Sequence, residues 1–238
     1  MQKEVIIACD FENKESLNSF LKKFSAEQSL FLKIGMELYY SEGPDIVREL
    51  KEYGHKIFLD LKLHDIPNTV YRTMKVLSKM NIDMCNVHAA GGIDMMRSAK
   101  EGLMENAKNN PLLIAVTQLT SMSQEQMIKD ILINEKIEKV ISHYAQNAKE
   151  AGLSGVVCSA QEAEIIHDVC GKEFITVTPG IRFNDKNEDD QVRVLTPIQA
   201  RNKGADYIVV GRPITKAEDP RHIYERCVSE FVYGEIFD

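Results

Sequence analysis

Residues 57–62 of the chain read Ile57-Phe58-Leu59-Asp60-Leu61-Lys62. Successive side chains of a β-strand point to opposite faces, so a strand here carries Phe58, Asp60 and Lys62 on one face and aliphatic side chains on the other. We expect the aliphatic face to pack against helices and the face with the two ions to point toward the centre of the fold. The stretch therefore predicts a strand with one apolar side and one partly ionic side.

Seven further short runs rich in Val, Ile, Leu and Phe have the length and composition of buried strands. In chain order they cover residues 5–9, 30–34, 84–88, 112–117, 155–158, 174–177 and 207–210. Apolar residues between and after these runs recur at the i, i+3, i+4, i+7 spacing of amphipathic helices. That spacing is clearest in residues 17–24, 137–144 and 224–231, and it is weaker in 70–77 and 95–103. Strand and helix signals therefore alternate along the chain.

Eight strands separated by helices, with no hairpin turn between them, run parallel, and eight is the number that closes a (β/α)8 barrel. We expect a single (β/α)8 TIM barrel, an α/β fold, that takes up residues 1–238 as one domain. The alternative, a doubly wound sheet, normally has a glycine-rich turn after its first strand, whereas this chain continues with Cys9-Asp10-Phe11-Glu12. The polar stretch 184–191 is predicted to be a long loop rather than a domain boundary, because helix and strand patterns resume after it.

The composition excludes several classes of protein. With 44% hydrophobic and 27% charged residues, the chain is globular rather than disordered or collagen-like. A net charge of −7 argues against a general nucleic-acid binder but allows a local pocket for a small anion. Five cysteines without a Cys-x-x-Cys pair support neither a disulfide framework nor a zinc site. Since the sequence has no signal peptide and no run of about 18 apolar residues, we expect a soluble, cytoplasmic protein that does not contact membranes.

The carboxyl ends of the expected strands are unusually polar, and in such a barrel these ends form the functional face. The residues there are Asp10, Lys33, Asp60, Lys62, Asp65, His88, Thr117, Thr120, the segment 178–182, Gly211 and Arg212. Asp60 and Lys62 can pair side by side, and Lys33 from the neighbouring strand can reach the same place. A structural ion pair is the ordinary alternative. Because each ion turned into a barrel loses much of its hydration, several ions together favour a functional site.

A second cluster follows the seventh and eighth strands, where Gly180 precedes Arg182 by two residues and Gly211 is followed by Arg212. Glycine lets backbone N–H groups approach an anion, arginine offers a bidentate fork, and phosphate sites recur after these two strands in this fold. Turn glycines beside surface arginines are the alternative. Asp10 either caps the first helix or contacts a ligand, and we interpret His88 as a neutral histidine inside the barrel.

Residues 60–69, Asp60-Leu61-Lys62-Leu63-His64-Asp65-Ile66-Pro67-Asn68-Thr69, resemble the signature of the orotidine 5′-phosphate decarboxylase family, bacterial type. Five further segments resemble the family in the same order, so that the resemblance covers essentially the whole chain. They are residues 86–92, 119–122, 177–182, Asp190-Gln191 with Arg193, and residues 210–215. One departure is Phe183, where many relatives have proline after the arginine; it affects the stiffness of a loop.

The resemblance implies a carboxy-lyase that converts orotidine 5′-phosphate to UMP and CO₂, the final step of de novo pyrimidine biosynthesis, as a homodimer without metal or organic cofactor. Lys62 would donate the proton to C6 within an array of Lys33, Asp60, Lys62 and Asp65. The resemblance further implies that Asp10 and Lys33 contact the ribose, that Thr120 contacts the pyrimidine, and that Gln191, Gly211 and Arg212 hold the phosphate. Pro179 and Arg182 would belong to the loop that closes over the substrate. Asp65, Ile66 and Thr69 would reach into the site of the partner subunit.

Two alternatives remain open. One is a metal-dependent phosphosugar lyase of the same barrel superfamily, such as 3-keto-gulonate-phosphate decarboxylase or hexulose-phosphate synthase, which shares the Asp-x-Lys-x-x-Asp core. The continuation Ile66-Pro67-Asn68-Thr69 argues against it. The other is a non-catalytic sensor of a phosphorylated ligand, and the intact charge array argues against that one.

Overall fold

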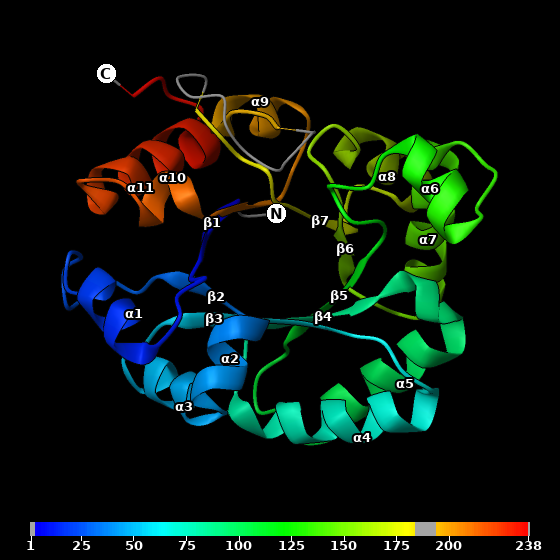
Figure 1. Cartoon of the computed structure of the whole chain (residues 1–238), viewed down its shortest axis with the longest axis horizontal. Coiled ribbons are helices and arrows are strands. Elements are labelled where there is room, and N and C mark those ends of the chain that lie inside the picture. The colour runs from blue at the N-terminus through cyan, green and yellow to red at the C-terminus, as the bar shows by residue number, and fades with distance from the viewer. Residues whose placement is uncertain (1–2, 184–193, 238) are drawn as a thin grey trace.

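The strands lie where the apolar runs predict them and form the wall of a closed barrel (Figure 1). The computed structural model describes residues 3–183 and 194–237, and within these ranges eight parallel strands pair in chain order, with the last returning to the first. Their bounds are β1 Glu4–Ala8, β2 Phe31–Gly35, β3 Lys56–Leu63, β4 Met84–His88, β5 Leu112–Val116, β6 Gly155–Val157, β7 Ile175–Thr178 and β8 Tyr207–Val210. The predicted (β/α)8 barrel is confirmed.

Helices surround this ring of strands on the outside (Figure 1). Their bounds are α1 Lys14–Leu21, α2 Met36–Glu42, α3 Asp45–Glu52, α4 Pro67–Leu77, α5 Gly92–Met104, α6 Gln124–Ile131, α7 Ile137–Glu150, α8 Ala163–Cys170, α9 Pro197–Asn202, α10 Arg212–Thr215 and α11 Pro220–Val228. Short 3-10 turns occupy Ser78–Met80 and Ala89–Gly91, and a π-helical turn, Ser229–Tyr233, continues α11. The predicted helical patterns coincide with α1, α4, α5, α7 and α11.

The alternation along β3 divides the core into two layers, as its sequence predicts. Ile57 and Leu59 are fully buried between the strands and the surrounding helices, within the large outer cluster. Phe58 belongs to a second cluster inside the barrel, together with side chains such as Ile6, Ile114 and Val177. This inner cluster fills the barrel below the charged residues, so the mouth has an apolar floor.

Several helices begin at residues whose side chains satisfy their first backbone N–H groups. The Asn13 side chain accepts a hydrogen bond of 2.9 Å from the Ser16 amide at the start of α1. Ser123 and Thr196 form capping boxes at α6 and α9. Because Asn13 caps α1, the alternative in which Asp10 caps the first helix is wrong, and the Asp10 side chain pairs with Lys33 instead.

The regular pairing of β3 with β4 is interrupted at the segment of β3 that contains Asp60 and Lys62. Leu59 pairs with Cys85 of β4 and Leu63 pairs with Val87, so three residues of β3 lie opposite one residue of β4. Within this bulge Lys62 has φ 51, in the left-handed region. The regular extended strand expected for residues 57–62 is therefore wrong at Lys62, because bulges and left-handed residues follow from strand pairing rather than from the local pattern. Phe58, Asp60 and Lys62 nevertheless line the same pocket, as predicted. The Lys62 ammonium still pairs with Asp60.

Two sequence expectations concern the surroundings of the chain. In the part of the chain that the structure describes, no helix has both the length and the apolar character that a membrane span requires. All five cysteines are buried and no disulfide joins them. Burial raises the pKa of the Cys85 thiol to about 12, so this thiol stays protonated and unreactive at neutral pH.

Candidate active site

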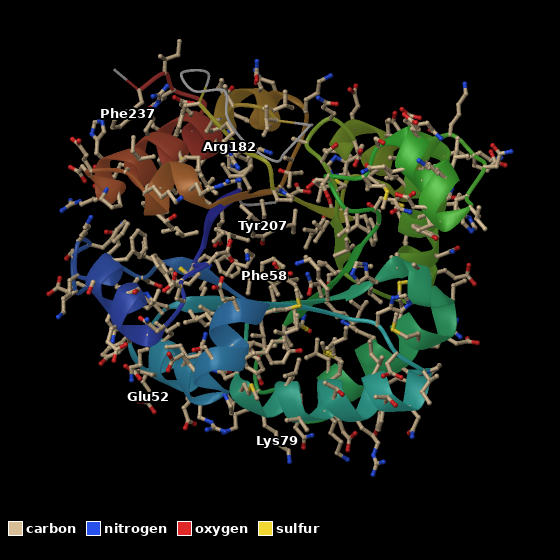
Figure 2. The ribbon with its side chains drawn as sticks, in the orientation of Figure 1. Glu52, Phe58, Lys79, Arg182, Tyr207 and Phe237 are labelled. Atoms are coloured by element: carbon tan, nitrogen blue, oxygen red, sulfur yellow. The ribbon has the colours of Figure 1, made fainter. Side chains whose placement is uncertain are left out.

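A pocket of about 550 Å³ opens at the carboxyl ends of the strands. It brings together residues that the sequence places far apart, because parallel strands end at the same side of a barrel. The sequence-predicted residues that line it are Asp10, Lys33, Asp60, Lys62, Thr120, Pro179, Arg182, Gly211 and Arg212. Its apolar floor includes Phe58, which lies near the centre of the view in Figure 2, whereas Glu52 and Lys79 lie at the rim of the molecule.

Four charged side chains form a chain of ion pairs on one wall of this pocket. Lys33 Nζ lies 3.0 Å from Asp10 Oδ1 and 3.2 Å from Asp60 Oδ2, and Lys62 Nζ lies 2.6 Å from Asp60 Oδ1. The Lys33 and Asp60 side chains are only 11% and 10% exposed, while Lys62 is 27% exposed. The inner pair is therefore enclosed, whereas the Lys62 ammonium and the Asp10 carboxylate, whose side chain is 61% exposed, remain open to the pocket.

The charges in this wall stabilise one another. Burial alone would raise the pKa of Asp60, but the ammonium groups of Lys33 and Lys62 hold that pKa below its usual value. Burial alone would lower the pKa of Lys33, but Asp60 and Asp10 raise it above its usual value. Both groups therefore stay ionised at neutral pH, and the pocket presents a fixed arrangement of charge before any ligand enters.

The opposite wall carries the predicted anion-binding residues. Pro179, Gly180 and Arg182 follow β7, and Gly211 and Arg212 follow β8, across the barrel mouth from β3. Gly180 has φ 82, which glycine adopts without steric cost. The Arg182 guanidinium donates to the Ile181 carbonyl oxygen at 2.8 Å. Arg182 and Arg212 both border the one pocket.

Three predicted residues, Asp65, Ile66 and Thr69, do not line this pocket in their own chain. The Asp65 side chain is exposed, and its carboxylate accepts a 2.7 Å hydrogen bond from the Ile66 amide. Ile66 is 66% exposed at the start of α4, and Thr69 lines a separate surface groove with Tyr39 and Tyr40. The predicted phosphate contact Gln191 and the resembling residues Asp190 and Arg193 lie outside the described residues, as does the whole of the predicted loop 184–191.

Sequence reasoning missed two polar residues that line the pocket, Asn86 and Lys216. Asn86 lies between Met84 and His88 on β4, and the same period of two that singles out Asp60 would have turned it inward. Lys216 follows Arg212 by four residues, the spacing that puts two side chains on one side of a helical turn.

His88 is half-buried at the end of β4, and its ring lies 5.7 Å from that of His64. Burial, followed by the nearby charge of His64 and Lys62, lowers the pKa of His88, so that it is neutral at neutral pH. Phe183, the departure from the family pattern named above, packs against Arg226 of α11, whose guanidinium carbon lies 4.1 Å from the ring centroid.

Chemically, the pocket combines a proton-bearing cation with an anion site. The Lys62 ammonium can stabilise negative charge that develops beside it and can deliver a proton there. The arginines at the other wall can bind a phosphate with charge-assisted hydrogen bonds. Across the described ranges, no group of three or more His, Cys, Asp or Glu side chains is arranged to hold a metal ion.

Comparisons with known proteins agree with this description. The model of the family described as orotidine 5′-phosphate decarboxylase / HUMPS matches residues 3–227. The chain is 59% identical over 232 residues to an orotidine 5′-phosphate decarboxylase of Streptococcus agalactiae, covering 97% of this chain and 98% of that one. It is 55% identical over 228 residues to one of Bacillus cytotoxicus, covering 94% and 95%. The crystal structure of an orotidine 5′-phosphate decarboxylase from Lactobacillus acidophilus superimposes with a TM-score of 0.87 at 42% identity, covering 96% of this chain and 99% of that chain.

Proposed function

Because this chain belongs to the orotidine 5′-phosphate decarboxylase / HUMPS family, we propose that it converts orotidine 5′-phosphate to UMP and CO₂, the final step of de novo pyrimidine biosynthesis. It is a carboxy-lyase, like the relatives it matches along nearly its whole length. One observation carries the proposed mechanism: the Lys62 ammonium, 2.6 Å from Asp60, faces a pocket whose opposite wall bears Arg182 and Arg212.

In this proposal Lys62 stabilises and then protonates the carbanion. Loss of CO₂ from C6 leaves an electron pair in the plane of the pyrimidine, where the ring cannot delocalise it, so a cation fixed beside C6 lowers the barrier. Lys62 then gives its proton to C6. Asp60 and Lys33 hold the ammonium in place, and these ion pairs, already formed in the structure, require little reorganisation during the reaction.

We assign the remaining wall of the pocket to the rest of the substrate. Asp10 and Lys33 contact the ribose, Thr120 contacts the pyrimidine, and Gly211 and Arg212 hold the phosphate, with Pro179 and Arg182 beside it. Gln191, which lies outside the described residues, is assigned to the phosphate on the family resemblance alone. The phosphate is far from the bond that breaks, so its binding energy acts by orienting the base against Lys62. The enclosing walls of the pocket support this orientation.

Replacing Arg212 by alanine is expected to weaken UMP binding by about 1.5 to 3 kcal/mol, because a charge-assisted hydrogen bond to the phosphate is lost. Calorimetric titration measures this change. Arg221→Ala, which removes the same charge from the surface of α11, is the matched control and should leave UMP binding unchanged. Orotidine, which has no phosphate, should bind the Arg212→Ala and unaltered proteins almost equally. Equal losses for both ligands would contradict the assignment of Arg212.

We further propose that the chain works as a homodimer in which Asp65, Ile66 and Thr69 complete the partner's site. The position of these residues outside their own pocket supports this assignment. A surface that could pair with a second copy lies beside them: Tyr40 of α2 and Val76 of α4, which are 74% and 56% exposed, line the same surface groove as Thr69. Large exposed apolar side chains gathered in this way are typical of protein interfaces.

No cofactor or metal ion enters the proposed mechanism, and the direct assay of the function also tests this point. Loss of orotidine 5′-phosphate absorbance, followed in a spectrophotometer, is expected to proceed at the same rate with and without EDTA. Turnover that stops in EDTA would favour the metal-dependent phosphosugar lyase. Binding of UMP without any turnover would favour the non-catalytic sensor. We place this activity in a single catalytic domain of residues 1–238 in the cytoplasm, where the buried thiols remain reduced.

A further inference from the structure

Asn86 lies on β4 beside the segment of β3 that carries Asp60 and Lys62. It is the single residue of β4 that lies opposite the bulge in β3, between the pairs Leu59–Cys85 and Leu63–Val87. Its side chain points into the barrel and is nearly inaccessible, since the residue is 1% exposed. A buried amide requires hydrogen-bond partners for both its oxygen and its nitrogen, so the partners of Asn86 reveal what it holds.

Both partners of the Asn86 amide belong to the proposed catalytic pair. Asn86 Oδ1 accepts a 2.8 Å hydrogen bond from the backbone N–H of Lys62, and Asn86 Nδ2 donates a 2.7 Å hydrogen bond to Asp60 Oδ1. In a regular ladder a backbone carbonyl of the neighbouring strand would accept from the Lys62 amide. At the bulge that carbonyl is replaced by a side-chain oxygen.

We propose that Asn86 is a positioning residue for the decarboxylation. It holds the Lys62 backbone and the Asp60 carboxylate so that the Lys62 ammonium keeps its position in the pocket. This inference rests on the proposed function and deepens it. Asn86 acts through Lys62 and Asp60.

The hydrogen bond to the Lys62 backbone stabilises the unusual conformation of this residue. Left-handed φ values are unfavourable for a residue with a side chain, and Lys62 has φ 51. The hydrogen bond from its N–H to Asn86 Oδ1 satisfies the backbone in that conformation and opposes a return to an extended strand. An extended Lys62 would start its side chain from a different direction, away from the position in which Nζ meets Asp60.

The hydrogen bond from Asn86 to the Asp60 carboxylate fixes the orientation of that carboxylate. Asp60 Oδ1 accepts from both Lys62 Nζ and Asn86 Nδ2, while Oδ2 faces Lys33 Nζ at 3.2 Å. Because Asn86 Nδ2 is a neutral donor in a fixed position, it holds the Asp60 carboxylate in the orientation in which each oxygen meets one lysine. Burial tends to raise the pKa of Asp60, and donation by Asn86 adds to the two lysines in lowering it.

The amide of asparagine is suited to this place by its size and by its two different ends. A leucine has a similar volume but neither donor nor acceptor. An ionised aspartate accepts from the Lys62 amide but repels Asp60. A protonated aspartic acid, in contrast, can accept with one oxygen and donate with the other, and so reproduces both contacts of Asn86.

The first test compares Asn86→Leu with Thr117→Val. Thr117, which directly follows β5, is also buried, and its hydroxyl donates to the Val157 carbonyl at 3.0 Å, so its replacement removes a buried hydrogen bond away from Lys62 and Asp60. We expect kcat of Asn86→Leu to be about 10- to 100-fold below that of Thr117→Val, the usual worth of hydrogen bonds to a charged group. The Kd for UMP, which has no carboxylate at C6, should stay within about threefold.

A second variant uses protonation as a rescue. Asn86→Asp places two carboxylates side by side, which raises the pKa of one of them, so that lowering the pH returns the proton that mimics the amide. The ratio of its kcat to that of the unaltered enzyme should therefore rise as the pH falls from about 8 to 5, by up to about tenfold per pH unit. Lys33 on β2, Lys62 on β3, His64 after β3 and His88 on β4 also carry or change charge near this site. They are present in both enzymes, and the ratio isolates residue 86.

These measurements separate failure of the inference from failure of the proposed function. If the unaltered chain does not consume orotidine 5′-phosphate, the function itself is wrong. If it does, the inference is overturned when Asn86→Leu keeps kcat within about threefold of Thr117→Val, or when its loss of kcat is matched by an equal loss of UMP affinity. Should Asn86→Leu fail to fold, a pH-independent activity ratio for Asn86→Asp overturns the inference.

Discussion

Replacing Lys62 by alanine is expected to lower kcat for orotidine 5′-phosphate by at least about 10²- to 10⁴-fold, the usual worth of a general acid, and by more where charge stabilisation is lost as well. The variant removes the proton donor and the cation that faces the pocket. UMP binding should change much less, because the contacts proposed for UMP lie mainly at the other wall. The measurements are kcat for the substrate and Kd for UMP on a folded variant.

UMP is the appropriate reference ligand for this variant. Without Lys62, the Asp60 carboxylate keeps Lys33 as its cation, and its remaining charge repels the carboxylate of the substrate. KM for the substrate can therefore rise for a reason unrelated to proton transfer. Lys56→Ala is the matched control: Lys56 lies at the other end of the same strand, in an exposed pair with Glu4. A Lys62→Ala enzyme with kcat within tenfold of the control, or with an equal loss of UMP affinity, would refute the proposed role.

Mixing an Asp65→Ala chain with a Lys62→Ala chain is expected to restore activity that neither variant has alone. Each hybrid dimer places both substitutions in one site and leaves the other site intact. With random exchange, half of the dimers are hybrids, so about a quarter of the full activity should return. The measurement is kcat per site after subunit exchange, which is followed independently with a size or affinity tag.

The control for this experiment is a mixture of Lys33→Ala and Lys62→Ala chains. Both residues line the pocket of their own chain, so every hybrid site carries one substitution and no activity should return. Asp65, in contrast, lies exposed beyond the end of β3, outside that pocket. If the Asp65→Ala mixture also fails to recover after exchange has been verified, Asp65 acts within its own chain.

The barrel could be predicted from the sequence because its signals are local. Each strand is a short apolar run, and the run length, the alternation along residues 57–61 and the intervening helical periodicity are properties of neighbouring residues. Helices α2 and α3 were not predicted. They are short, separated only by Gly43 and Pro44, and their bounds depend on packing against β2 and β3 more than on a repeated pattern.

The sequence predicted most of the residues that form the candidate site, but not the contacts between them. Parity and strand ends identify Asp60, Lys62 and Lys33, because parallel strands deliver their ends to one place. The left-handed Lys62 and its hydrogen bond to Asn86 depend on the register between β3 and β4, which no single stretch of sequence encodes. The choice of Asn13 rather than Asp10 as the helix cap likewise depends on where α1 begins in space.

The closed ring of strands also decides how this protein can associate. In the described part of the chain every strand has a hydrogen-bonded neighbour on both sides, so the sheet offers no free edge on which a strand of another molecule could be added. Contacts between copies must therefore be made by side chains on helices and loops. Such contacts are specified residue by residue, so single substitutions can weaken or redirect assembly while the backbone pairing of each barrel stays intact.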